Sequence, residues 1–120
     1  MTNTEITRIA DNWITLRSND SFSDSELDLE LPFNQPDVCL DVILNILEKI
    51  DAIPENKVFD ILAAGPLEDL LHEHGNTVID KIEILARTNP KFRKLLNGIW
   101  DNELEQSIKD KLAKYMVDRW

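Results

Sequence analysis

Glu68, Asp69, His72 and His74 form the only cluster in the chain of side-chain types that ligate metals. On a helix, Glu68 and His72 lie four residues apart and share one face with Asp69 beside them, so these three predict a weak divalent-cation site. The zinc-protease signature needs two histidines four residues apart, whereas these two are two apart and face away from each other. A polar helix end also explains the cluster without a metal, because histidines there favour the helix dipole.

Other catalytic constellations are missing from the sequence. The single cysteine, Cys39, lies on the most apolar stripe of the chain, where a thiol is hard to ionise. No serine elbow motif occurs, and three glycines provide no phosphate-binding loop. The sequence therefore favours a protein that is not an enzyme and that needs no cofactor.

A basic run, Lys91, Arg93 and Lys94, follows Pro90 at the start of an expected helix. Cations are disfavoured at this positive pole, so something negative should lie nearby. Three interpretations are open: a bound anion at the helix N-terminus, internal pairing with the acidic residues 20–30, or a surface patch without a function. We favour the internal pairing.

An acidic stretch, SDSELDLELPF at residues 23–33, alternates acids with leucines. Ser23 and Glu26 have capping-box spacing, and Leu27 and Leu31 lie one helical turn apart, which predicts one or two helical turns. The alternation is also typical of a strand edge, but a lone strand in a helical chain leaves its backbone unsatisfied. Either way the acids face solvent, as a solvated connection or as a docking surface for a basic protein. The acids concerned are Asp20, Asp24, Glu26, Asp28 and Glu30.

The elements that position these residues are all expected to be helices, because apolar residues recur every three or four positions. The expected helices span about 3–17, 36–50, 54–64, 66–75, 76–88, 90–97 and 101–115. Gly65 and Pro66 predict a kink or tight junction, and Gly75 is expected to end a helix. The pattern predicts an all-α fold with six to seven helices. Residues 1–120 should form a single-domain irregular bundle or a short two-layer stack of helical hairpins.

Charge is distributed unevenly along the 120 residues, whose net charge is −10. Residues 1–60 hold 13 acids and 4 bases, and residues 61–120 hold 10 acids and 9 bases. Such a field repels nucleic acid and attracts basic proteins. No apolar run approaches the roughly 18 residues of a membrane span, so we expect a cytoplasmic protein without membrane contact.

Two blocks, LAAGPLEDLLHEHG (62–75) and NPKFRKLLNGIW (89–100), resemble a bacterial family of small helical proteins known only as a domain of unknown function. The resemblance spans about residues 10–105 and implies an all-helical bacterial cytoplasmic protein, with no catalytic residues to transfer. Residues 20–34 are more acidic than the family pattern.

Three functional hypotheses follow. The first is a small acidic binding module, such as an immunity-type or inhibitor protein that neutralises a basic toxin or nuclease. The second is a metal-binding protein or small metal-dependent enzyme centred on Glu68, Asp69 and His72. The third is a homodimer in which a second copy covers exposed apolar residues such as Trp120.

Overall fold

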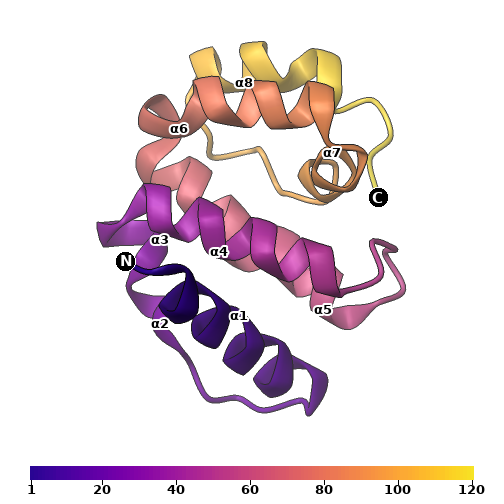
Figure 1. Cartoon of the computed structure of the whole chain (residues 1–120). Helices are drawn as coiled ribbons and strands as arrows, with labels where there is room; N and C mark the ends of the chain where they lie inside the picture. Colours follow the sequence, from indigo (N-terminus) through magenta and orange to yellow (C-terminus); the bar gives the residue numbers. More distant parts are fainter.

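The centre of the fold is α4 (Pro36–Lys49), which packs against α1 (Asn3–Ser18) and against α6 (Glu68–Thr88). The computed structural model describes all 120 residues, and none of them forms a strand. Figure 1 shows α1 below α4, with the second half of α6 and α8 above it and α7 seen nearly end-on beside them. The expectation of an all-α bundle is confirmed.

The remaining elements are short. They are α2 (Glu26–Leu29), α3 (Leu31–Asn34), α5 (Lys57–Leu62), a π-helical turn η1 (Ala63–Leu67), α7 (Pro90–Leu96), α8 (Gln106–Leu112) and a 3-10 turn η2 (Ala113–Tyr115). Because α5, the π-helical turn and α6 follow one another directly, the chain contains seven continuous helical runs, within the predicted number of six to seven. The runs themselves differ from the expected ones, because three expected helices over 54–88 form a single run and α2 and α3 supply two more. The last helix begins at Gln106 instead of near residue 101.

One hydrophobic core joins these elements. A single cluster of 31 buried apolar residues draws on every α-helix, with Trp13, Phe59 and Phe92 among its largest fully buried side chains. Each such side chain contributes roughly 1.5–3 kcal/mol by leaving water. The radius of gyration, 13.3 Å, matches the value of about 13.6 Å expected for one domain of this length. No helix is both long and apolar enough to cross a bilayer.

Of the two glycines singled out in the sequence, Gly65 lies within a continuous helical run, whereas Gly75 directly follows a kink. Gly65 has a negative φ and lies inside the π-helical turn, where the extra residue accommodates Pro66 without a break. Gly75 lies within α6, which bends at the non-helical His74 (φ −134°, ψ 27°). A Cβ on Gly75 would lie 3.1 Å from Cδ1 of Ile108, so the glycine allows α8 to approach closely. The expected break near Gly75 is therefore present as a kink within α6, and the glycine also permits close packing of α8.

The C-terminus is held by the chain itself. Trp120 stacks on Phe59 with ring centroids 5.2 Å apart, and its indole Nε1 donates to the carbonyl of Lys94 at 2.6 Å. Asn97, the one buried polar residue, donates to the carbonyl of Tyr115 at 3.0 Å and accepts from the amide of Asp118 at 3.0 Å. Trp120 is therefore half-buried within its own chain and is not the exposed apolar residue that the homodimer hypothesis used.

Candidate partner-binding surface and acidic pocket

The acidic segment, defined as residues 20–34, contains two single-turn helices, α2 and α3. The prediction of helical turns is confirmed, although the cap differs from the expected one. Ser25, not Ser23, is the N-cap, and its amide donates to Oδ2 of Asp28 at 2.8 Å. An acid three residues after a capping serine satisfies the free N–H of the cap residue. The same geometry turns Asp28 inward.

Asp28 makes contacts within the fold, which corrects the expectation that all the acids of this segment face solvent. Its Oδ1 accepts from Nε1 of Trp13 at 3.0 Å, and its Oδ2 accepts from Nη2 of Arg17 at 3.0 Å. Only 17% of its side chain is exposed, so the Arg17–Asp28 pair is shielded from solvent. The donors come from the core-facing side of α1, and the carboxylate satisfies groups that would otherwise be buried without a partner.

The other four acids of the segment remain at the surface. Asp20 pairs with Lys57 at 2.8 Å, and Glu26 pairs with Arg8 at 3.1 Å. These partners are exposed or half-exposed, so both ion pairs are weak and exchangeable. Asp24 and Glu30 are exposed and form neither an ion pair nor a side-chain hydrogen bond. Their charges are free to act on another molecule.

Exposed apolar side chains lie among these acids. The side chain of Phe22 is 98% exposed, that of Leu29 is 63% exposed, and that of Phe33 is 38% exposed. His74 fixes the end of the segment, because its Nε2 lies 2.5 Å from the carbonyl oxygen of Phe33. The acids of the segment were predicted from the sequence, whereas the exposure of Phe22 and Leu29 was not. Both residues stand between acids in the sequence, at 20–24 and 28–30, which is the only local feature that marks them.

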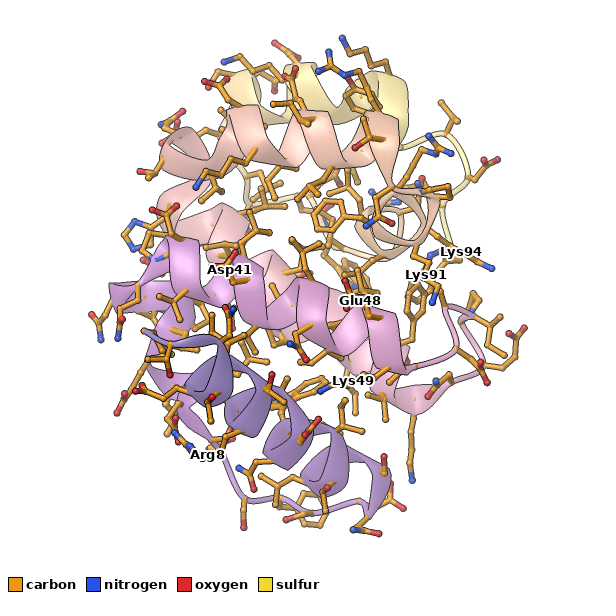
Figure 2. The ribbon with its side chains drawn as sticks, in the orientation of Figure 1. Arg8, Asp41, Glu48, Lys49, Lys91 and Lys94 are labelled. Atoms are coloured by element: carbon orange, nitrogen blue, oxygen red, sulfur yellow. The ribbon has the colours of Figure 1, made fainter.

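The basic run does not pair with residues 20–30. Nζ of Lys91 donates to the carbonyl of Leu47 at 3.3 Å, and Nη1 of Arg93 donates to the carbonyl of Ala86 at 3.0 Å. These carbonyls belong to the last turns of α4 and α6, the negative poles of both helices. The side chain of Lys94 has no partner. Figures 1 and 2 show Lys91 and Lys94 beside the α4–α5 loop, on the opposite side from α2.

Glu68, Asp69 and His72 line one cavity of about 420 Å³, here called the acidic pocket. Its opposite wall comes from the loop that leads into α8. The four residues of this wall are Trp100, Asn102, Glu103 and Leu104. The loop is tied to α6 because the amide of Trp100 donates to Oε1 of Glu68 at 2.7 Å. Nε2 of His72 lies 3.9 Å from Oε2 of Glu103 across the pocket.

Asp69 is the most perturbed carboxylate of the protein. Partial burial raises its pKa, and the nearby charges of Glu68, Glu73 and Asp28 raise it further, against a lowering contribution from His72. Its carboxylate has no hydrogen-bond donor and no ion-pair partner. The pocket therefore holds a half-buried carboxyl group that has no hydrogen-bond or ion-pair partner within the chain.

Neither the metal nor the nucleophile candidates are assembled for chemistry. No group of three His, Cys, Asp or Glu side chains has an arrangement that could hold a metal ion. Glu68, Asp69 and His72 thus line a common cavity without converging on one point. Burial, followed by the charge of Asp69, raises the pKa of the Cys39 thiol to about 12. This thiol remains protonated at neutral pH, as expected for a core residue.

A family of unknown function, DUF6869, matches residues 17–119. The chain belongs to this family. No curated protein and no solved structure gives a significant match. The matched range of this DUF6869 protein includes both the acidic segment and the acidic pocket. The wall formed by Trp100 and the residues after it was not predicted, because residues 101–115 were expected to be helical, whereas α8 begins only at Gln106.

Proposed function

We propose that this DUF6869 protein is a small bacterial cytoplasmic binding protein that recognises a basic protein partner. An immunity-type or inhibitor protein that neutralises a basic toxin or nuclease fits this description. The block Leu62–Leu71 and the block 89–100 are the motifs that suggest the bacterial family. The observation that carries the proposal is the exposure of Phe22 and Leu29 beside the unpaired acids Asp24 and Glu30.

The two kinds of side chain would do different work in such an interface. Burying an exposed phenylalanine or leucine against a partner yields roughly 1.5–3 kcal/mol each. Unpaired carboxylates contribute mainly to the rate of encounter with a positive surface, and this contribution falls as salt rises. The charge of residues 1–60, with 13 acids against 4 bases, extends the attracting field beyond the segment. The charges would then speed the encounter with a basic partner, and the apolar contacts would slow its dissociation.

The first test separates the apolar contribution from general stickiness. The wild-type protein and the double variant Phe22→Ser/Leu29→Ser are used to capture proteins from a lysate of the native host at low salt. We expect a basic protein, most informatively one encoded by an adjacent gene, to bind the wild type at least about tenfold more tightly than the variant. Capture of the same proteins by both forms would contradict the proposal, as would capture of acidic proteins only.

The second test measures the charge contribution with the partner identified by the first. Asp24→Asn/Glu30→Gln should reduce the association rate several-fold at low salt and leave the dissociation rate nearly unchanged. The matched control is Asp41→Asn/Glu48→Gln, which removes two exposed acids from the solvent face of α4 (Figure 2). An equal slowing by both double variants would show that net charge acts without any contribution from this surface.

Sedimentation at two concentrations tests the homodimer as the alternative occupant. A dimer that forms in the wild type and is lost in Phe22→Ser/Leu29→Ser would assign the surface to a second copy of the chain. A monomer at both concentrations agrees with a different partner.

A further inference from the structure

The acidic pocket has two chemically different walls. One wall, from the first turns of α6, presents Glu68, Asp69 and His72, and the other presents the indole of Trp100 with Asn102 and Leu104. Trp100 is 68% exposed although it lines a cavity of about 420 Å³. A large aromatic ring that lines a hollow instead of closing it remains available to a ligand.

The size of the pocket favours an organic group over a metal ion. A volume of this size lies within the range of about 300–1,000 Å³ that small-molecule sites occupy. Glu103, at the rim, is 87% exposed, and no three potential ligands converge as a metal requires. The carboxylates are instead spread around a space large enough for the end of a side chain.

The ligand should be cationic and planar. Three carboxylates line the pocket, and the carboxylate of Asp69 has neither a donor nor an ion-pair partner. The face of Trp100 attracts a cation by its ring quadrupole. A guanidinium group meets both demands, because it donates two parallel hydrogen bonds to a carboxylate and also stacks on an aromatic ring. An ammonium group is a compact point charge and gains less from this geometry.

The pocket adjoins the proposed docking surface. Helix α2 contacts the π-helical turn from which α6 begins, and the charge of Asp28 contributes to the raised pKa of Asp69. The start of α6, which carries the carboxylates of the pocket, is therefore a neighbour of the acidic segment. A single basic partner could contact both.

We infer that the acidic pocket binds the guanidinium group of an arginine side chain of the partner, stacked on Trp100 and hydrogen-bonded to Glu68 and Asp69. The inference rests on the proposed function for the source of the arginine. The pocket itself needs only the guanidinium, so it is testable without the partner.

The test is an NMR titration of the full-length protein with arginine amide. Citrulline amide, which has nearly the same shape without the charge, and lysine amide serve as comparison ligands. We expect arginine amide to shift the indole N–H resonance of Trp100 and the backbone resonances of residues 68–72 and 100–104 in a saturable manner. Citrulline amide should shift none of them, and lysine amide should bind several-fold more weakly. Equal affinities for arginine and lysine amides would overturn the inference, and so would an absence of saturable shifts in the pocket.

Variants sharpen the titration. Trp100→Ala and Glu103→Gln each change an exposed side chain, and the first should weaken binding of arginine amide about tenfold. Glu103→Gln should weaken it by a smaller factor because its carboxylate lies at the rim. Asp80→Asn, an exposed acid farther along α6 with no ion pair, is the matched charge control and should leave affinity unchanged. If Asp80→Asn and Glu103→Gln weaken binding equally, the arginine responds to net charge and the pocket assignment is wrong.

The two proposals fail separately. If arginine amide leaves the pocket resonances unmoved while a basic protein still requires Phe22 and Leu29, only the pocket assignment fails. If arginine amide occupies the pocket while no basic protein is captured, the partner hypothesis fails and the guanidinium site stands.

Discussion

The acidic segment (residues 20–34) and the basic run (Lys91, Arg93 and Lys94) are the two parts of the chain with the most one-sided charge. They differ in how many of their charged side chains have partners within the fold. In the basic run, two of three cations bind carbonyl oxygens at the ends of α4 and α6. In the acidic segment, Asp28 is enclosed by donors from α1 and its own N-cap, whereas Asp24 and Glu30 have no partner.

The difference shows that a charged side chain can be satisfied by backbone groups as well as by an oppositely charged side chain. The last four carbonyls of a helix are unsatisfied acceptors with a partial negative charge, so a lysine or arginine from a neighbouring helix stabilises them. Free carboxylates have no equally common counterpart except at helix N-termini. Lys91 and Arg93 are thereby used within the fold, whereas Asp24 and Glu30 remain available to solvent or a partner.

The largest predicted effect on stability concerns Asp28, the acid of the segment whose carboxylate is bound within the fold. Asp28→Ala removes the acceptor of Trp13, Arg17 and Ser25 and leaves part-buried donors unsatisfied, so we expect a loss of about 3 kcal/mol in the free energy of unfolding. Asp28→Asn should lose less, because it keeps an acceptor for the indole. Chemical denaturation measures both.

Asp24→Ala is the control for that measurement. It removes the same charge from the same segment at an exposed position without a partner, so its free energy of unfolding should stay within about 0.5 kcal/mol of the wild type. Similar losses for the two alanine variants would erase the distinction between the enclosed and the free acids.

The next effect tests the basic run. Arg93→Ala removes a charged donor from the carbonyl of Ala86 at the end of α6, and we expect a loss of about 1 kcal/mol in the free energy of unfolding. Lys94 is adjacent to Arg93 in sequence, but its side chain has no acceptor. Lys94→Ala should therefore leave the free energy of unfolding almost unchanged. Thermal and chemical denaturation of both variants give the comparison. A larger loss of unfolding free energy in Lys94→Ala than in Arg93→Ala would mean that these cations stabilise the fold by their net charge and not by bonds to helix ends.

Much of the fold could be predicted from periodicity and caps. The stripe of α4 and the Thr2 cap of α1 follow from residues close in sequence, because apolar spacing and hydroxyl capping act within one or two turns. The break near Gly75 is likewise a local signal and occurs as the kink at His74, whereas Gly65 and Pro66 continue the helical run as a π-helical turn. The close approach of Ile108 to Gly75, across 33 positions of sequence, could not be predicted, because local patterns contain no information about that contact.

The candidate site divides in the same way. The acidic segment and the trio Glu68, Asp69 and His72 were visible as sequence clusters, but the second wall of the pocket is brought by Trp100 from a loop distant in sequence. The direction of Asp28 was also hidden, since it depends on where α1 places Trp13 and Arg17. Charge and composition predict which residues are polar, whereas tertiary packing decides which of them are used internally.

The smallest predicted effect on stability concerns Asp69. Its replacement should stabilise the fold, whereas replacement of Asp28 should destabilise it. Burial and the charges of Glu68, Glu73 and Asp28 raise its pKa in the folded state, with His72 opposing them. The folded protein then binds this proton more tightly than the unfolded chain does. The contribution of Asp69 to stability therefore decreases as pH rises from the ordinary aspartate pKa through the raised value, and an ionised Asp69 destabilises the fold at neutral pH.

Asp69→Asn should consequently unfold at a slightly higher temperature than the wild type at neutral pH. The gain should be less than about 1 kcal/mol, because solvent screens a carboxylate that is only partly buried. The gain should shrink as pH falls below the ordinary aspartate pKa, where both forms are uncharged at this position. Thermal unfolding followed across this pH range measures it, with Asp80→Asn as the exposed control. A lower melting temperature for Asp69→Asn would mean that the carboxylate stabilises the fold as Asp28 does, and the contrast between the two acids would then disappear.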